Sequence, residues 1–382
     1  MKLNLFTTNT CNLNCNYCYE GDKNKNRMTK ETGKQIIDFF WDKDKDGIFN
    51  INFHGGEPLI EFELIKYLVE YINEKRKLTN PDFRLEFSMT TNGTLLTQEI
   101  ADFLHAHQFI LRLSLDGNEQ AHNLHRRTFN NKGSFEQVLQ GAGYLRNAGA
   151  DFTVRMTVTP ENVVYLTDSV EWLIANHFLK INIIADSFAN WDDQFERLTA
   201  SFERIKEFYL IERPVSNLKI NLFDGKFSCY MLDSPPLFCN AGFGSFSLST
   251  SGEIYPCVYV VDQEEYCIGD IFRGISPLKR KTCIESSLLR ENGCGDCSIQ
   301  GFCHARKCGF LNLVTNGYLD RPNPFLCKHE QVLYSMQSEV VEQLYQNGDQ
   351  QIHWMFDKLK TMPELKVNQK IEKYIRGEER VY

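Results

Sequence analysis

Thirteen cysteines are the residues of this chain whose type and spacing most directly suggest chemistry. Three of them, Cys11, Cys15 and Cys18, lie within the first eighteen residues, and the other ten lie beyond position 228. An odd count, close clusters and no export signal argue against the disulfide framework of a secreted protein. Three thiols on one loop can wrap a soft metal centre, and because a cubane iron–sulfur cluster takes four ligands, they would leave one iron open. A partial zinc site is the alternative, although structural zinc sites normally close with a fourth ligand and no histidine precedes His54.

The overall composition is that of a globular protein with roughly two to three domains. The 382 residues are 42% hydrophobic and 24% charged, and 42 basic against 50 acidic residues give a formal charge of −8. A net acidic chain is a poor general nucleic-acid binder. No apolar run approaches the ~18 residues of a membrane helix, and the N-terminus turns polar too early for a signal peptide. We therefore expect a cytoplasmic protein that binds neither nucleic acid nor membrane.

Alternating strands and helices are expected to position these cysteines. The spacing of apolar residues between the strands, as in Leu64–Ile72, is typical of amphipathic helices, and Thr29 and Thr97 are predicted helix starts. Six strand–helix units predict an α/β fold with a parallel sheet and right-handed crossovers. Curled, the units would make a partial (β/α)6 TIM-like barrel, which the sequence alone does not distinguish from an open sheet. The six predicted strands are Leu3–Thr7, Ile51–His54, Arg84–Met89, Ile110–Leu115, Phe152–Val158 and Ile181–Ala185.

The alternation of strands and helices ends around Arg213-Pro214. The following segment is rich in cysteine and glycine and is predicted to form short strands, including a hairpin at Thr250-Ser251-Gly252. A segment with so small a hydrophobic core needs additional crosslinks to be stable, and bound metal can supply them. Helical patterning returns in Val332–Leu344. We predict a barrel domain at 1–225, a small Cys-rich domain at 226–335 and a C-terminal helical segment at 336–382, whose last part, 366–382, is a charged amphipathic stretch without an assigned function.

The spacing Cys11-x3-Cys15-x2-Cys18, with the aromatic Tyr17 before the last cysteine, resembles the signature of the radical S-adenosylmethionine (SAM) enzymes. This resemblance implies that the three cysteines hold a [4Fe–4S] cluster whose open iron binds the amino and carboxylate groups of SAM. An electron from the cluster then cleaves SAM to a 5′-deoxyadenosyl radical, which abstracts a hydrogen atom from the substrate. The segment His54-Gly55-Gly56-Glu57-Pro58 resembles the GGEP element of the same family.

Further SAM-binding residues follow from this resemblance. Two glycines let the backbone approach the methionine amino group, and Glu57 is expected to accept from its ammonium. The segments Thr90–Gly93 and Ser114–Gly117 end the third and fourth strands, where ligands bind in α/β folds. One arginine of the pair Arg126-Arg127 is expected at SAM, and a surface charge is the alternative for either. The expected SAM-binding residues are Tyr17, Gly55, Gly56, Glu57, Pro58, Thr90, Asn92, Ser114, Asp116, Arg126 and Arg127.

The later cysteines resemble the SPASM extension of radical SAM peptide maturases, apart from one extra residue between Cys303 and Cys308. The resemblance implies two auxiliary [4Fe–4S] clusters, three clusters in all, and a zinc ribbon is the alternative. A distal cluster is assigned to Cys294, Cys297, Cys303 and Cys327. A nearer cluster is assigned to Cys239, Cys257 and Cys308, with Cys229 as the best candidate for a fourth ligand.

Two further thiols, Cys267 and Cys283, are expected to be small buried hydrophobes. Cys267 is also a candidate catalytic hydrogen-atom donor, as a radical epimerase would require. Cys283 carries no assigned role.

The SPASM resemblance implies an anaerobic oxidoreductase that matures a ribosomally made peptide by a thioether or carbon–carbon crosslink, or by epimerisation. The alternative is formylglycine formation on a protein Cys or Ser, as in anaerobic sulfatase maturases. Those enzymes place a catalytic aspartate directly after the cysteine that corresponds to Cys257, whereas this chain has Val258 there and its nearest downstream carboxylate at Asp262.

The expected partners are a peptide or protein substrate and an electron donor such as flavodoxin or ferredoxin. Because the barrel is predicted to begin at residue 2 or 3, a leader peptide would dock elsewhere or through a separate leader-binding protein. An iron–sulfur electron carrier or redox sensor is the non-enzyme alternative, and a zinc-stapled binding protein is a third class.

Overall fold

The computed structural model describes residues 1–20, 26–41, 48–79, 82–232, 240–288, 294–306 and 308–361, without the side chains of 283–288. The chain divides into two compact units that alternate along the sequence. The first unit comprises Met1–Leu115, His122–Arg155 and Cys239–Leu288, and the second comprises Asp116–Ala121, Met156–Phe238 and Leu289–Tyr382. The domain boundaries predicted from the sequence stay predictions.

The first unit is built on a sheet with the strand order β11-β10-β9-β8-β1-β2-β3-β4-β5. The strands from β8 through β1 to β5 pair in parallel, and β8 to β11 pair antiparallel. The predicted hairpin at Thr250-Ser251-Gly252 is confirmed, because it joins β8 to β9. The strands are β1 (Lys2–Thr8), β2 (Ile48–Gly55), β3 (Arg84–Thr91), β4 (Ile110–Ser114), β5 (Phe152–Val158), β8 (Ser245–Leu248), β9 (Glu253–Tyr255), β10 (Gly269–Asp270) and β11 (Gly274–Ile275).

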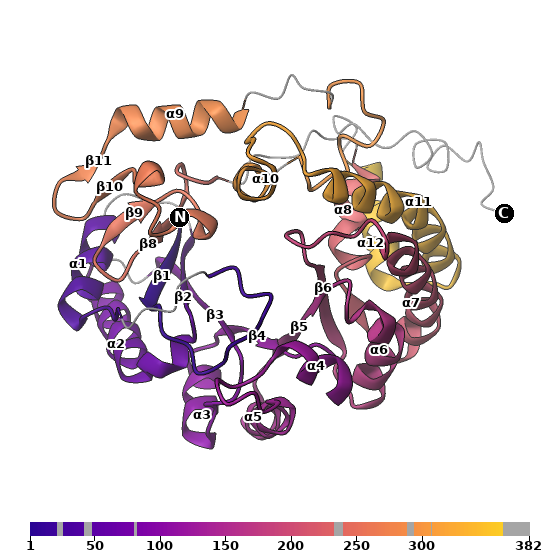
Figure 1. Ribbon diagram of the computed structural model, residues 1–382, viewed down its shortest axis with the longest axis horizontal. Coiled ribbons are helices and arrows are strands. Elements are labelled where there is room, and N and C mark those ends of the chain that lie inside the picture. Colours follow the sequence, from indigo (N-terminus) through magenta and orange to yellow (C-terminus); the bar gives the residue numbers. More distant parts are fainter. Residues whose placement is uncertain are drawn as a thin grey trace. The chain divides into compact units, whose positions relative to one another are not determined.

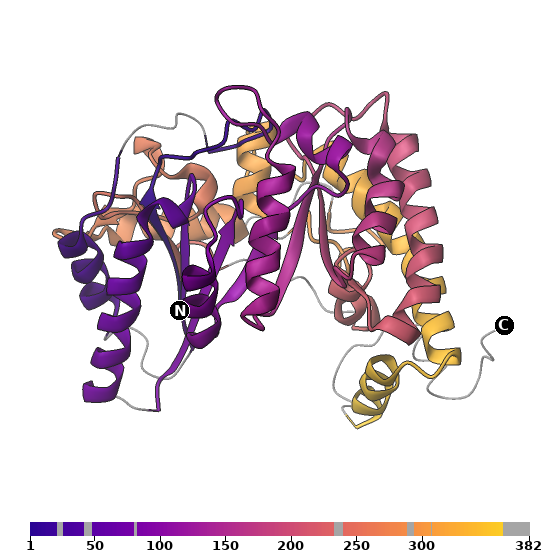
Figure 2. The same cartoon turned by 90° about the horizontal axis from the view of Figure 1, so that it is seen from below.

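Four helices cover one side of strands β1 to β4 and run alongside them (Figures 1 and 2). They are α1 (Lys30–Trp41), α2 (Phe62–Thr79), α3 (Gln98–Ala106) and α5 (Phe135–Asn147). Both predicted helix starts are confirmed: the Thr29 and Thr97 hydroxyls accept from the N–H groups of Thr32 and Ile100 at 3.0 and 3.3 Å. Smaller elements are η1 (Pro58–Glu61), α4 (Glu119–His125), η4 (Val258–Val260), η5 (Glu264–Tyr266) and α9 (Pro277–Leu288).

The second unit contains the end of β5 and two more strands, β6 (Lys180–Ala185) and β7 (Lys219–Ile220), which pair in parallel. The sequence did not predict the two-residue strand β7. Helices α6 and α7 lie on one side of β6 (Figure 1), and α11 packs against α7, α8 and α12. The helices are η2 (Val163–Tyr165), α6 (Leu166–Ala175), α7 (Phe195–Ser216), η3 (Asp224–Lys226), α8 (Phe227–Met231), α10 (Gly309–Asn316), α11 (Pro324–Gln346) and α12 (Gln350–Lys360).

The predicted α/β class with a parallel sheet is confirmed, and the six predicted strands lie within three residues of the observed ones. The predicted helical pattern of Val332–Leu344 lies inside α11. The amphipathic stretch 366–382 lies outside the described residues.

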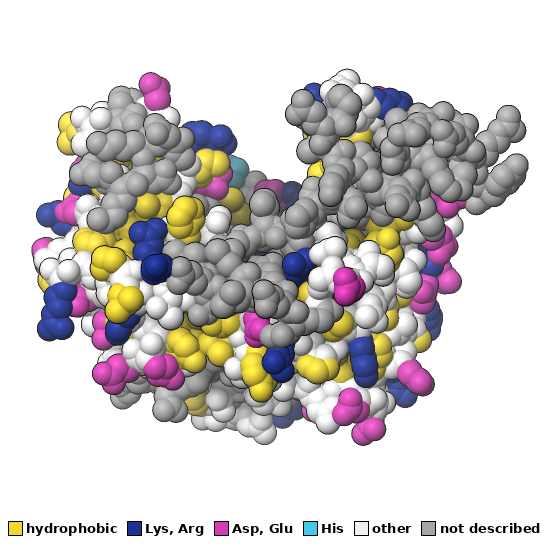
Figure 3. Space-filling model, turned by 90° about the horizontal axis from the view of Figure 1, so that it is seen from above, with side chains coloured by type: hydrophobic (Ala, Val, Ile, Leu, Met, Phe, Trp, Pro, Cys, Tyr) yellow, Lys and Arg dark blue, Asp and Glu magenta, His cyan; other side chains and the backbone are white. Residues whose placement is uncertain are grey.

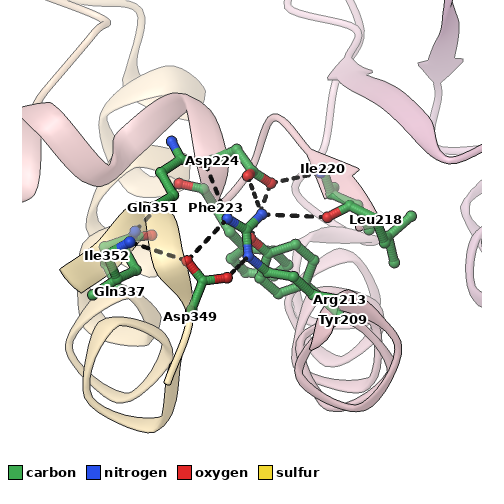
Figure 4. A network of polar contacts seen from close by, with 10 residues as sticks. All are labelled: Tyr209, Arg213, Leu218, Ile220, Phe223, Asp224, Gln337, Asp349, Gln351 and Ile352. Atoms are coloured by element: carbon green, nitrogen blue, oxygen red, sulfur yellow. Dashed lines mark hydrogen bonds and ion pairs between the residues drawn. The ribbon is translucent and has the colours of Figure 1, made fainter. Parts of the chain in front are cut away.

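A buried arginine organises the second unit (Figure 4). The side chain of Arg213, near the end of α7, is 3% exposed and pairs with Asp224 and Asp349. Its Nε donates to Asp349 at 2.7 Å and its Nη1 donates to the Leu218 carbonyl at 3.3 Å. Asp349 also caps α12 by accepting from the Ile352 N–H at 3.0 Å. One guanidinium thus connects the end of α7 and the start of α12 to the segment that follows α7, because its several donors all find acceptors.

The face drawn in Figure 3 carries basic and acidic side chains interspersed with apolar ones. Among the helices that the structure describes, none is both long and apolar enough to cross a membrane.

Candidate active site

The cysteine loop, residues 11–18, directly follows β1 and is tied to the segment after α4. The Asn14 N–H donates to the carbonyl of Arg127 at 2.7 Å, and the fully buried Leu13 forms an isolated antiparallel β-bridge with Thr128. Within the loop, the Leu13 N–H donates to Cys11 Sγ at 3.4 Å. Neighbouring backbone thus shapes the loop, while its three cysteines stay half-buried.

The GGEP segment packs its backbone against the residues just before the cysteine loop. The Gly56 N–H donates to the Thr8 carbonyl at 3.0 Å, and the Glu57 N–H donates to the Thr10 carbonyl at 2.9 Å. A Cβ on Gly56 would lie 2.4 Å from the Thr10 oxygen, and one on Gly55 would lie 2.0 Å from the Thr8 oxygen. The glycines are therefore required by this close backbone approach. Their expected contact with the methionine amino group stays a prediction.

Glu57 is 1% exposed, and both of its carboxylate oxygens accept hydrogen bonds. One accepts from the Thr91 hydroxyl at 2.7 Å and the Leu59 N–H at 3.1 Å, and the other accepts from the Asn92 N–H at 2.7 Å. Burial raises the pKa of Glu57 to about 7, against the opposing effect of these hydrogen bonds. The side chain thus joins the ends of β2 and β3, and its expected contact with the SAM ammonium stays a prediction.

Asn92 continues this chain of contacts to the first cysteine. Its side-chain N–H group donates to Asn12 Oδ1 at 2.8 Å and lies 3.8 Å from Cys11 Sγ. Asn12 in turn donates to the Thr94 hydroxyl at 2.7 Å. Asn12 and Thr94 were not predicted from the sequence, although Asn12 stands inside the cysteine motif and Thr94 directly follows the strand-end motif of β3.

The structure separates the two candidate arginines. Arg126 is 7% exposed, and its guanidinium lies 5.3 Å from the ring centre of Tyr17 in the cysteine loop. Arg127 instead donates from Nε to the Asn123 carbonyl at 2.7 Å and from Nη1 to Asn131 at 3.1 Å. Arg126 is therefore the arginine at the cysteine loop, next to the aromatic residue of the motif.

The remaining expected SAM residues are distributed over both units. In the first unit, Ser114 is buried at the end of β4, Pro58 is buried at the start of η1, and Thr90 is half-buried in β3. Asp116 belongs to the second unit, where it is buried and accepts from the Thr157 N–H at 2.8 Å.

A second polar cluster beside the cysteine loop was not predicted. His54 Nδ1 lies 3.3 Å from Glu20, and the Tyr19 hydroxyl lies 3.4 Å from His54 Nε2. The Tyr19 ring packs 5.0 Å from the ring of Tyr259, which follows Cys257 by two residues. Burial lowers the pKa of His54 to about 4. The positions of Tyr19 and Tyr259 next to predicted ligand cysteines were the available signal.

Asp262, the nearest carboxylate after Cys257, accepts from Asn9 Nδ2 at 2.8 Å. Asn9 lies between β1 and the cysteine loop. Val258 begins the short helix η4 directly after Cys257.

In the second unit, Cys327 interacts electrostatically with both Cys294 and Cys297. Cys303 is buried and receives hydrogen bonds from the N–H groups of Ala305 and Arg306, and burial raises the pKa of its thiol to about 11. Cys308 directly precedes α10. Cys239 lies outside the described residues.

The thiols without a firm ligand assignment have different surroundings. Cys229 Sγ lies 3.3 Å from His304 Nε2 in the second unit, a contact that was not predicted from the sequence. The Cys267 thiol donates to the Gly269 carbonyl at 3.3 Å in the first unit. The side chain of Cys283 is outside the described part of the chain. A donor role for Cys267 stays a prediction.

The chemistry of the donor sets decides which group they fit. In the part of the chain that the structure describes, no three Cys, His, Asp or Glu side chains are gathered tightly enough to enclose a metal ion. The N-terminal loop nevertheless offers three thiols from one short segment, and soft thiolates are the ligands of iron–sulfur clusters. The loop therefore fits a [4Fe–4S] cluster with one iron left open.

Comparison with protein families and curated relatives supports this assignment. Residues 5–173 match the model of the Radical SAM superfamily. An uncharacterized protein of Methanocaldococcus jannaschii is 35% identical over 171 residues, 45% of this chain and 57% of that protein. The cysteine-type anaerobic sulfatase-maturating enzyme of Clostridium novyi is 27% identical over 328 residues, 78% of this chain and 85% of the enzyme. The subtilosin biosynthesis protein AlbA of Bacillus subtilis is 25% identical over 329 residues, 77% of this chain and 66% of AlbA.

Two solved structures share the fold. Native anSMEcpe with bound AdoMet and Cp18Cys peptide aligns with a TM-score of 0.74 at 21% identity, covering 89% of this chain and 98% of that chain. Streptococcus suis SuiB bound to its precursor peptide SuiA aligns with a TM-score of 0.61 at 15% identity, covering 86% of this chain and 75% of SuiB. The two structures add only the shared fold, whereas the superfamily match and the three-cysteine loop identify residues 5–173 as a radical SAM domain, from a superfamily of enzymes that use a [4Fe–4S] cluster and SAM.

Proposed function

We propose that this protein is a radical SAM/SPASM maturase that modifies a ribosomally made peptide by a thioether or carbon–carbon crosslink or by epimerisation. The observation that carries the proposal is the cysteine loop, whose first thiol is connected through Asn92 to the buried Glu57 at the end of β2. The similarity to two proteins supports a peptide substrate. AlbA is a biosynthesis protein for the bacteriocin subtilosin, and SuiB was solved bound to the precursor peptide SuiA.

In this proposal Cys11, Cys15 and Cys18 hold the first cluster. SAM held at this cluster would, on one-electron reduction, release methionine and supply a 5′-deoxyadenosyl radical for abstraction of a hydrogen atom from the substrate. Arg126 and Ser114 bind SAM, with the strand-end groups of β2 and β3 around them. Glu57, whose two oxygens accept three hydrogen bonds within the protein, is the proposed acceptor from the SAM ammonium.

We assign two auxiliary [4Fe–4S] clusters to the later cysteines. The distal cluster takes Cys294, Cys297, Cys303 and Cys327, and the electrostatic proximity of Cys327 to Cys294 and Cys297 supports this set. The nearer cluster takes Cys239, Cys257 and Cys308, with Cys229 as the candidate fourth ligand. The proposed electron donor is a flavodoxin or ferredoxin, and the proposed location is the cytoplasm.

A second candidate is formylglycine formation on a protein Cys or Ser. The similarity to the sulfatase-maturating enzyme of Clostridium novyi favours it. Val258 argues against it, since it occupies the position of the catalytic aspartate of those enzymes. The nearest downstream carboxylate, Asp262, accepts a hydrogen bond from Asn9. Incubation with a sulfatase peptide separates the two proposals: formylglycine would appear only under the second.

The test is iron and SAM chemistry on anaerobically purified protein. We expect about twelve irons per chain, four for each cluster, and reductant-dependent release of 5′-deoxyadenosine. Cys15→Ala should abolish SAM cleavage, whereas Cys283→Ala, at a cysteine with no assigned role, should retain it. Retained cleavage in Cys15→Ala would refute the assignment of the first cluster to Cys11, Cys15 and Cys18. No SAM binding or cleavage by the wild type would refute the enzyme and favour an electron carrier or redox sensor.

A further inference from the structure

The second unit contains a buried ion pair next to the later cysteines. Lys226, the residue before α8, and Glu330, in α11, are each 5% exposed. The Lys226 ammonium donates to both carboxylate oxygens of Glu330, at 2.8 and 2.7 Å, and lies 4.9 Å from the ring centre of Phe302. Removing two charges from water is costly, and a buried pair persists only where further hydrogen bonds compensate.

The compensating contact comes from a cysteine-containing segment. Glu330 also accepts from the N–H of His304 at 2.8 Å, and His304 directly follows Cys303. The His304 ring lies 3.3 Å from the thiol of Cys229, three residues after Lys226. Residues three apart share one face of a helix. The Cys303–His304 segment is therefore contacted by the carboxylate through its backbone and by α8 through the imidazole.

The two charges act on Cys303 with opposite sign. Lys226 favours negative charge on the sulfur of Cys303, and Glu330 opposes it. A cluster gains a negative charge when it is reduced, and fixed charges and hydrogen bonds near the ligand sulfurs set its potential. Each charge alone would move that potential, and in opposite directions.

We propose that Lys226 and Glu330 form a charge-balanced pair that positions the Cys303–His304 segment and sets the reduction potential of the distal cluster. Both are positioning residues, acting through Cys303 and its neighbour. This inference rests on the proposed assignment of the distal cluster.

The experiment is a redox titration of the distal cluster in the reconstituted full-length protein, followed by electron paramagnetic resonance. Dithionite supplies the single electron, and ferricyanide removes it. Changing Cys11, Cys15 and Cys18 together to Ala removes the signal of the SAM cluster, and changing Cys239 and Cys257 to Ala removes that of the nearer cluster, so that the distal cluster is measured alone.

Lys226→Met leaves the carboxylate uncompensated and should lower the potential, whereas Glu330→Gln leaves the ammonium uncompensated and should raise it. Each shift should change the ratio of reduced to oxidised cluster at least tenfold at a fixed applied potential, which is about 59 mV for one electron. The double variant should return close to the wild-type value, Lys226→Arg should retain it, and Lys360→Met, in the exposed pair with Asp357, should leave it unchanged.

Shifts of both single variants in one direction, or no shift in either, would overturn the proposal and leave only a structural role for the pair. If the single variants lose the cluster, the double variant must restore iron, because it contains no unpaired buried charge; failure to do so would also overturn it. Wild-type protein with about four irons would instead refute the proposed auxiliary clusters, and this inference with them.

Discussion

The carboxylate of Glu57 accepts a hydrogen bond from the backbone N–H of Asn92 at 2.7 Å, which connects the end of β2 to the end of β3. The side chain of Asn92 then reaches Asn12 and Cys11, so one buried acid is two contacts away from the first cysteine. The cysteine loop is therefore connected through Glu57 and Asn92 to the ends of both strands.

The raised pKa of Glu57 predicts a pH-dependent stability. The pKa is about 7 in the folded protein against an ordinary value of 4.5, so the folded state holds a proton that the unfolded chain releases between these values. Stability from this group is present below pH 4.5 and is lost as the pH rises through 7, by about 3 kcal/mol. Urea unfolding of the apo-protein at pH 5 and pH 8 should show this difference, and Glu57→Gln should remove it.

The matched control is Glu63→Gln, at an exposed carboxylate in α2, which should keep the wild-type pH dependence. An unchanged pH dependence in Glu57→Gln would mean that Glu57 stays ionised throughout.

The contact between Gly56 and Thr10 predicts that Gly56→Ala disturbs the cysteine loop. Its Cβ would lie 2.4 Å from a backbone oxygen, so the loop must move. Because misplacement by about 1 Å can cost about 100-fold in rate, we expect a loss of that order in 5′-deoxyadenosine production, with less iron retained. Gly143→Ala is the control: its Cβ would meet nothing within 4 Å in α5, and alanine should stabilise the helix by about 1 kcal/mol. Full iron and turnover in Gly56→Ala would show that the loop tolerates the shift.

The different surroundings of Arg126 and Arg127 predict different effects on SAM affinity. Arg126→Gln should weaken binding about 10- to 100-fold, the range for one hydrogen bond to a charged group. Arg127→Gln should bind SAM as the wild type does, because the Arg127 guanidinium donates its hydrogen bonds to Asn123 and Asn131. Calorimetry on the reconstituted protein measures both. Equal weakening by the two changes would contradict the assignment.

The Arg213 network predicts a large loss of stability on Arg213→Met. The substitution leaves Asp224 and Asp349 without their shared cation, and breaking a buried ion pair from one side costs about 3–5 kcal/mol. The midpoint of urea unfolding should fall accordingly. Arg273→Met removes a side chain that is 90% exposed and should leave the midpoint unchanged. A loss below about 1 kcal/mol in Arg213→Met would mean that water replaces the guanidinium.

The sequence by itself was sufficient for the α/β class, the six strands and the radical SAM motif. These features are local: strand and helix periodicity extends over a few residues, and the three cysteines lie in one short loop. Helix starts at Thr29 and Thr97 were predictable for the same reason, because the capping hydroxyl acts only three residues ahead.

Only the tertiary structure decided which distant residues meet. It paired β8 with β1, so that Ser245–Leu248 lies beside the N-terminal strand although the intervening sequence gives no sign of it. In the folded chain Arg126, and not Arg127, lies against the ring of Tyr17, and Lys226 pairs with Glu330, 104 residues away. Such contacts depend on how whole elements pack and which face each one buries, and the spacing of residues along the chain does not contain that information.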